Sequence, residues 1–356
     1  MTNMKTLPLN LSILKEIQKY LSKSNLDFAL LSKMDAKHLV GSVSIVLIPK
    51  KGKPLIYLNG LEINNFQSSK DYNLSSDFEI LRNQLKNKSV GMNFLTTSTV
   101  MYLKIKCKKK DISSYLSILR QTKLAQELNY TKKSCAIAQK IIKSAIDEIG
   151  ISLFSEQDII KFLKIETIKA DCELAFEPLA ASGKNAAVPH SLPSNMKLKK
   201  GFLILDFGVK YNGYCSDISR TIYLGKPSMN EIKLYNRVLN VQKKCIKKIN
   251  DIIGKNAGLL DNYARKELKE LKEEFIHSLG HGTGLEVHEA PAIAFKSKDV
   301  LLPNSIITIE PGIYNLDKGY GIRIEDDVLV TNLGSKVLTN SLSKNLIIKP
   351  VFSKKK

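Results

Sequence analysis

The chain has 356 residues, of which 43% are hydrophobic, and this is ordinary for a globular protein with two domains or one large one. Its net charge of +21 would suit a polyanion, but the basic residues are spread along the chain without a zinc finger or an aromatic RNA-binding motif, so we expect no specific nucleic-acid site. No apolar run approaches the roughly 20 residues that span a bilayer, so we expect no membrane segment.

The N-terminal segment lacks a sustained apolar core followed by a small-residue cleavage site, so we expect no signal peptide. The five cysteines are widely spaced and form no CxxC pair, which favours free thiols over a disulfide framework. Together these features predict a cytoplasmic protein.

Residues 1–120 are predicted to form a small α/β domain. Its short apolar runs have the length of strands, and a turn rich in proline and lysine separates two of them. We expect helices at 11–21 and 78–85 and strands at 28–31, 43–48, 55–58 and near Val90. Because histidine, aspartate and glutamate do not cluster here, we interpret this part as a cap or an interaction domain.

Residues 121–356 are predicted to form a second domain in which helices are grouped between groups of hairpins. The pattern favours helices at 123–149, 155–169, 230–253 and 259–271, and strands over 201–224 and from His277 onward. Grouping of this kind indicates an α+β fold rather than alternating βαβ units.

Two aspartates lie on a predicted hairpin. Asn212-Gly213 is a strong type I′ turn sequence, and with these two loop residues Asp206 pairs opposite Ser219 while Asp217 lies one diagonal step away on the same face. Diagonal neighbours are ~7–8 Å apart, close enough for two carboxylates to bind one ion. An aspartate inside the run LILDFGV is costly to bury unless it is paired or bound to metal. A solvated aspartate on an edge strand is the alternative.

Three of the five histidines, His277, His281 and His288, fall within twelve residues, next to Glu289 and among three glycines. One neutral imidazole can bind a metal, and the others can donate to substrate oxygens. A lone core histidine would simply be hydrogen-bonded, but a cluster of this kind favours a functional site.

Two glutamates lie on predicted strands near the C-terminus. The strand 306–309 ends at Glu310, and a second strand over 322–330 places Arg323 and Glu325 on one face. The following Asp326 and Asp327 either orient a ligand or are solvated acids at a strand end.

Four carboxylates and one imidazole form a ligand set for two divalent cations that keep water within reach. The set comprises Asp206, Asp217, His281, Glu310 and Glu325. Because a water shared by two cations becomes a hydroxide nucleophile near neutral pH, the sequence predicts a metal-dependent hydrolase. Mn²⁺, Co²⁺, Fe²⁺ and Zn²⁺ all suit such ligands.

In this order, the motifs closely resemble the creatinase/prolidase/methionine aminopeptidase family, whose catalytic domain has the pita-bread fold. The resemblance runs from about Leu119 to the C-terminus. It implies that the five residues above are the metal ligands and that Asp217 and Glu325 bridge the two ions. It also implies a pita-bread domain at 121–356 behind a smaller α/β domain at 1–120.

Within that family the chain is most similar to the Xaa-Pro peptidases of the prolidase and aminopeptidase P type. His277, His288 and Arg323 have the family's spacing around the ligand histidine and the last glutamate. His190, at the end of a small-residue loop that alone is a weak indication of a pocket, matches a substrate-side histidine. Tyr314 matches a tyrosine near the active site.

The resemblance implies that a metal-bridged hydroxide cleaves the bond between an N-terminal residue and proline in a small peptide. It assigns catalysis to Glu310, His288 and His190, and substrate binding to His277, Arg323 and Tyr314. It further implies a homodimer.

Three alternatives stay open from sequence alone. They are an aminopeptidase of other specificity, a creatinase-like C–N hydrolase and a non-catalytic binding module on the same fold. The choice between dipeptidase and aminopeptidase is open as well. The segment Asp171–Leu174 also departs from the glycine-rich form usual at that place in the family, which affects the substrate-side loop.

Overall fold

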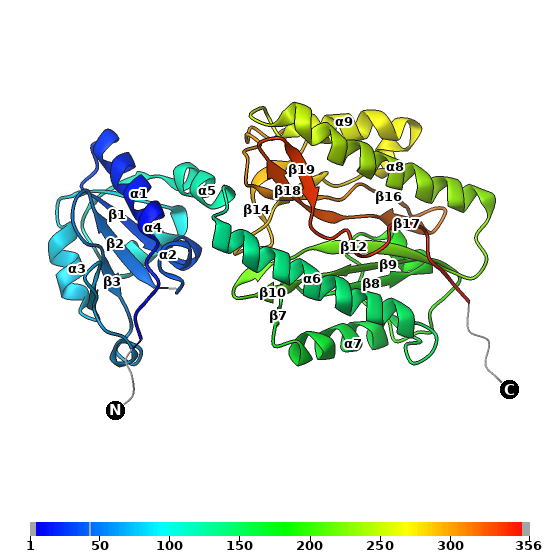
Figure 1. Cartoon of the computed structure of the whole chain (residues 1–356), viewed down its shortest axis with the longest axis horizontal. Coiled ribbons are helices and arrows are strands. Elements are labelled where there is room, and N and C mark those ends of the chain that lie inside the picture. Colours follow the sequence, from blue (N-terminus) through cyan, green and yellow to red (C-terminus); the bar gives the residue numbers. More distant parts are fainter. Residues whose placement is uncertain (1–4, 43, 351–356) are drawn as a thin grey trace. The chain divides into compact units, whose positions relative to one another are not determined.

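The computed structural model describes residues 5–42 and 44–350, and the chain divides into two compact units, residues 1–120 and 121–356. The first unit is built on a six-stranded mixed sheet in the order β4-β3-β2-β1-β5-β6 (Figure 1). Its helices are α1 (Leu11–Lys23), α2 (Lys33–Val40), α3 (Phe78–Leu85), α4 (Phe94–Tyr102) and α5 (Ser113–Gln121). Its strands are β1 (Phe28–Ser32), β2 (Ile45–Pro49), β3 (Leu55–Tyr57), β4 (Asn73–Ser75), β5 (Ser89–Met92) and β6 (Lys108–Asp111).

The structure confirms the helices and strands predicted for this unit and adds elements that the sequence pattern does not reveal. Val43, at the start of one predicted strand, lies outside the described residues. The helix α2 follows β1 directly because Lys33 turns the chain with a φ of 53°, without a glycine or proline to mark the turn. The edge strand β6 consists of exposed residues, so no apolar alternation announces it.

As far as residue 350, where the described part of the chain ends, the second unit contains four sheets. Its helices are α6 (Ala125–Glu148), α7 (Glu156–Lys169), α8 (Met229–Ile252) and α9 (Gly258–Leu268), with 3₁₀ turns η2 (Gly183–Ala187) and η3 (Lys269–Glu274). Its first strands are β7 (Glu173–Leu174), β8 (Leu179–Ser182), β9 (Gly201–Phe207), β10 (Val209–Tyr211), β11 (Tyr214–Cys215) and β12 (Ile218–Leu224). The later strands are β13 (Gly280–Gly282), β14 (Glu289–Ile293), β15 (Ile306–Ile309), β16 (Gly312–Asn315), β17 (Tyr320–Arg323), β18 (Asp326–Thr331), β19 (Gly334–Val337) and β20 (Ile348–Lys349).

Two helix pairs enclose these strands. In Figure 1, α6 and α7 lie on one side of the unit and α8 and α9 on the other, with the strands between them. Ile142 and Leu163 pack with strand residues such as Leu205, and a second core joins α8 and α9 to the β13–β15–β18 sheet. Burial of both apolar helix faces stabilises this arrangement, which confirms the α+β prediction. Within the described residues, no helix has both the length and the apolar character that a bilayer crossing requires.

The predicted hairpin register is confirmed. Asn212 and Gly213 both have positive φ, 49° and 86°, as a type I′ turn requires. Asp206 in β9 pairs with Ser219 in β12. The hairpin therefore brings Asp206 and Asp217 to one end of the unit's central strands.

The prediction of a single strand over 322–330 is wrong, because Ile324 and Glu325 lie between two separate strands. Strand β17 pairs with β16, whereas β18 pairs with β15, so the two segments belong to different sheets. The interruption follows from hydrogen bonds between this segment and strand β12. The N–H of Glu325 donates to the carbonyl of Ser219, and the N–H of Arg323 donates to the hydroxyl of Thr221.

Candidate metal centre

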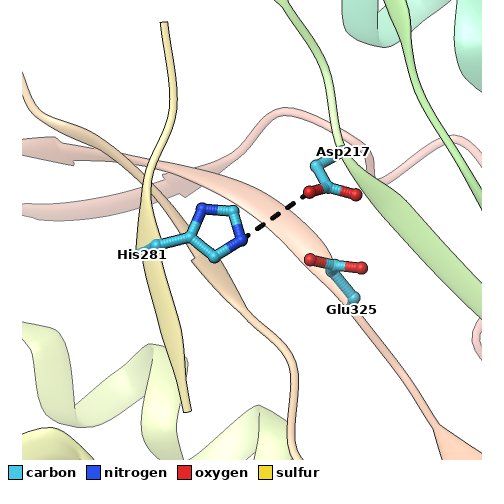
Figure 2. A group of neighbouring side chains, drawn as sticks. All are labelled: Asp217, His281 and Glu325. Atoms are coloured by element: carbon cyan, nitrogen blue, oxygen red, sulfur yellow. Dashed lines mark ion pairs between the residues drawn. The ribbon is translucent and has the colours of Figure 1, made fainter. Parts of the chain in front are cut away.

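Five different segments deliver the predicted ligand residues to one cavity of about 560 Å³. Asp206 lies in β9, Asp217 precedes β12, His281 lies in β13, Glu310 follows β15, and Glu325 lies between β17 and β18. Figure 2 shows that Asp217, His281 and Glu325 point toward one another, and one ligand atom from each lies within 4.8 Å of the others.

His281 presents a lone pair to this cluster. Its Nδ1 lies 3.1 Å from the carbonyl oxygen of Gly282, so Nδ1 carries the proton and donates it there. Its Nε2 then faces Asp217 Oδ2 at 3.7 Å and Glu310 Oε1 at 3.4 Å. Burial lowers the pKa of His281 to about 4, so the ring is neutral at pH 7. An acceptor nitrogen facing carboxylate oxygens is unfavourable unless a cation or a carboxyl proton lies between them, and this is the arrangement expected of a metal ligand.

The carboxylates also indicate that a cation binds here. Burial, followed by the charges of neighbouring acids, raises the pKa values of Asp217 and Glu325 well above the usual range. Burial raises the pKa of Glu310 to about 8, although Arg323 opposes this shift. Asp206 has one buried oxygen, Oδ1, with no hydrogen-bond partner among residues 5–42 and 44–350. A divalent cation bound by these oxygens would offset the cost of burying several like charges, so the residues fit a metal site.

Arg323 is buried and engaged by the protein at each of its three nitrogens. It donates from Nη2 to Asp206 Oδ2 at 2.6 Å, from Nη1 to Tyr314 Oη at 2.8 Å and from Nε to Ser219 Oγ at 2.9 Å. The geometry makes Arg323 a residue that orients Asp206 and Tyr314.

His277 and Tyr314 continue this hydrogen-bonded chain. The Nδ1 of His277 donates to the carbonyl of Ser278 at 2.8 Å, so its Nε2 accepts from the Tyr314 hydroxyl at 3.1 Å. Burial, followed by the charge of Arg323, lowers the pKa of His277 to about 3. His277 lines the cavity as a neutral ring, whereas Tyr314 lies behind it and is absent from the lining.

His190 and His288 occupy exposed positions on the cavity wall. The ring of His288 packs edge-on against His281, with centroids 4.3 Å apart. The loop that ends at His190 therefore does line a pocket. Much of the remaining wall is apolar, and it includes Phe176, Pro178, Leu179, Pro189, Leu192, Pro193 and Val287.

Several further residues support the ligands. Ser219 donates its hydroxyl to Glu325 Oε2 at 2.7 Å. Arg220 is buried and donates to the Glu325 carbonyl and to Asp326. Asp327 accepts the N–H of Asp217 at 2.8 Å. Asp326 and Asp327 are fully buried, so the interpretation of these two as solvated acids is wrong. Ser219 was discernible from the hairpin register, since it lies opposite Asp206.

Comparisons with known proteins agree with this geometry. A family model described as metallopeptidase family M24 matches residues 129–332. The Xaa-Pro dipeptidase of Pyrococcus furiosus is 37% identical over 271 residues, which is 74% of this chain and 76% of that protein.

Two solved structures match nearly the whole chain. The prolidase from Pyrococcus horikoshii OT3 has a TM-score of 0.85 at 31% identity, covering 94% of this chain and 100% of that one. The X-Pro aminopeptidase from Thermotoga maritima MSB8 has a TM-score of 0.79 at 28% identity, covering 91% and 98%. The prolidase match confirms the predicted pita-bread fold. The chain belongs to metallopeptidase family M24 and is a metal-dependent peptidase.

Proposed function

We propose that the protein is an Xaa-Pro peptidase that hydrolyses the bond between an N-terminal residue and proline. The observation that carries this proposal is the convergence of four carboxylates and a neutral imidazole on one cavity whose remaining wall is largely apolar. The similarity to proteins named Xaa-Pro dipeptidase and prolidase supports the choice of substrate.

We propose that Asp206, Asp217, His281, Glu310 and Glu325 hold two divalent cations, with Asp217 and Glu325 shared between them. Mn²⁺, Co²⁺, Fe²⁺ and Zn²⁺ suit these oxygen and nitrogen ligands. When bound, such ions lower the pKa of a water and polarise the carbonyl that it attacks.

Glu310 is the residue proposed to move the proton. It lies in the cavity beside His281, with its Oε1 3.4 Å from the Nε2 of that ring. A carboxylate in this position can accept a proton from the attacking water and pass it to the leaving proline nitrogen. His288, exposed on the same wall, is proposed to donate a hydrogen bond to the developing oxyanion.

The apolar wall is proposed to receive the proline ring. In a peptide bond, proline offers no N–H for an enzyme to recognise, so shape must replace hydrogen bonding. His190 and His277, which both line the cavity, are proposed to contact the substrate. Arg323 lines the cavity and has two N–H groups beyond its three bonds to the protein. We propose that it binds the substrate there and also positions Asp206 and Tyr314.

An aminopeptidase that accepts longer peptides is the second candidate, because the chain also matches an X-Pro aminopeptidase structure over 91% of its length. A homodimer, expected from the family, stays a prediction. None of the five cysteines, all of which lie among the described residues, forms a disulfide, and this supports the reducing cytoplasm that we propose as its location.

The test is hydrolysis of four peptides, Ala-Pro, Gly-Pro, Ala-Pro-Ala and Met-Ala-Ser, by the full chain loaded with Mn²⁺. Cleavage of the two dipeptides but not the tripeptides identifies a dipeptidase. Cleavage of Ala-Pro-Ala identifies an aminopeptidase. Preference for Met-Ala-Ser, or no turnover of any proline peptide, would contradict the proposed specificity.

A further inference from the structure

Glu156 is a buried acid with no place in the proposed chemistry. It begins α7, and its side chain is only 1% exposed. Its Oε1 accepts the N–H of Ser182 at 2.7 Å, the hydroxyl of Ser182 at 2.9 Å and the amide of Asn185 at 3.1 Å. Its Oε2 accepts the amide of Asn185 at 3.0 Å and the N–H of Ser194 at 2.7 Å. The carboxylate of Glu156 therefore accepts hydrogen bonds from three residues of one loop.

These donors lie at both ends of the segment 182–194, which we call the wall loop. Pro189, His190 and Leu192 of the wall loop line the metal-site cavity. The neighbour of Glu156, Gln157, adds a bond from its side chain to the Pro193 carbonyl at 3.1 Å. The first turn of α7 is thus the support on which the substrate-side wall rests.

The two halves of the wall loop are held differently. The first half, η2, packs directly on β17. The contact is so close that a Cβ at Gly321 would lie 1.7 Å from the carbonyl oxygen of Ala186. Ala186 is buried against Tyr314. In the second half, Leu192 is 87% exposed and Pro193 and Ser194 are only partly buried. The attachment of this half depends on hydrogen bonds to α7, and a charge-assisted bond is worth roughly twice a neutral one.

We infer that Glu156 is a positioning residue that sets the substrate-side wall of the cavity and thereby the affinity for the substrate. The inference rests on the proposed function, because it takes the cavity to be the peptide site. Glu156 touches none of the five ligand residues. Its loss is therefore expected to change KM and to leave metal binding intact.

Two variants and one matched control test this inference in the full chain with Mn²⁺. Glu156→Ala removes both acceptors. Glu156→Gln keeps a carbonyl for one set of donors and turns an amide toward the others. Asp158→Ala is the control, because Asp158 caps the same helix end through the N–H groups of Phe154 and Ser155 without touching the wall loop.

For Ala-Pro hydrolysis, Glu156→Ala is expected to raise KM at least about tenfold while kcat stays within about threefold, and Glu156→Gln to lie between it and the wild type. Asp158→Ala should keep the wild-type KM. Metal content should be the same in all four proteins. Equal KM values for Glu156→Ala and Asp158→Ala, or a loss of metal in Glu156→Ala, would overturn the inference.

Hydrogen exchange separates failure of this inference from failure of the proposed function. The amides of 182–194 should exchange at least about tenfold faster in Glu156→Ala than in Asp158→Ala, while those of β13 and β15 stay protected. If the wild type proves inactive on proline peptides, this result alone decides whether Glu156 holds the wall loop. Unchanged exchange in 182–194 would refute it.

Discussion

At the residue scale, Asp217 and Glu325 are costly to bury as charged groups, because both are buried and face other carboxylates. Asp217→Asn removes one of these charges and keeps the shape of the side chain. Without metal, this variant should therefore be more stable than the wild type by about 1–2 kcal/mol, while metal affinity and turnover fall at least about 100-fold. Thermal unfolding in chelator and metal titration measure the two effects.

Asp251→Asn on the exposed face of α8 is the matched control, and it should change neither quantity. If Asp217→Asn keeps near-normal turnover, the assignment of Asp217 as a ligand is wrong. A variant that simply unfolds in chelator would contradict the account of electrostatic cost.

The raised pKa of Glu310 predicts how pH acts on the metal-free protein. The folded carboxyl titrates at about 8 against a usual value of 4.5, so between these pH values the folded state binds a proton that the unfolded state releases. The contribution of Glu310 to stability is therefore greatest below about pH 5 and is lost as pH rises toward 8, by up to about 1.4 kcal/mol per pH unit. Urea unfolding in chelator at pH 5.5, 6.5 and 7.5 measures this slope.

Glu310→Gln cannot titrate at this position and isolates the effect. The difference in unfolding free energy between wild type and variant should become less favourable to the wild type as pH rises. A difference that is flat, or that moves in the opposite direction, would show that Glu310 is not an uncompensated buried acid.

At the scale of the element, the short strand β13 reaches its neighbours only because of its glycines. A Cβ at Gly280 would lie 2.1 Å from the carbonyl oxygen of Thr308. Gly280→Ala must therefore separate β13 from β15 and displace His281, the adjacent ligand. We expect a loss of about 2–4 kcal/mol in stability and weaker metal binding, measured by urea unfolding and metal titration.

Gly60→Ala serves as the control for that substitution. Apart from its two chain neighbours, no described residue has an atom within 4 Å of the position that a Cβ would take there, and its φ is not in the left-handed region. It should be close to neutral in both measurements. If the two alanine variants behave alike, close strand approach does not hold the ligand histidine.

Local chemistry explains which elements were predictable. Ser155 caps α7 and Ser228 caps α8 through reciprocal bonds with acids three residues later, and both helices begin next to the predicted residues. The Asn212-Gly213 turn fixes the hairpin register locally as well, because these two residues readily adopt the positive φ of a type I′ turn. At the break at Ile324–Glu325, Asp326 interrupts the apolar alternation of Ile322, Ile324, Val328 and Val330, so the sequence holds only a weak indication of it. The change of sheet itself depends on pairing with distant strands, which no local pattern reveals.

The same contrast holds within the site. The ligand residues stand out in the sequence because charged side chains are costly inside apolar runs. Their supports stand out less. The sequence left two interpretations of Asp326 and Asp327 open, and the structure bears out the one in which Asp327 orients a ligand, because it accepts the N–H of Asp217. Arg220 gives no such indication, because its partner Asp326 lies 106 residues further along the chain. The hydrogen bonds of Arg323 likewise cannot be read from the sequence, because they require Tyr314 and Asp206 to lie next to it in the folded chain.

At the scale of the whole molecule, the ligands span residues 206 to 325 and come from five segments, so the site exists only in the folded chain. Metal should therefore stabilise folding by mass action, by about 2.7 kcal/mol at a free concentration of 100 times the Kd. A thermal melt with and without Mn²⁺ measures this gain. Asp217→Asn should lose most of it, and a gain of equal size in that variant would point to binding elsewhere.

The most direct test of the account is a titration of chelated, metal-free protein with Mn²⁺, in which bound metal and Ala-Pro hydrolysis are measured on the same samples. We expect no turnover without metal, and turnover that rises until about two ions are bound per chain. Full hydrolysis by the metal-free protein, or metal that binds without restoring any hydrolysis of a proline peptide, would contradict it.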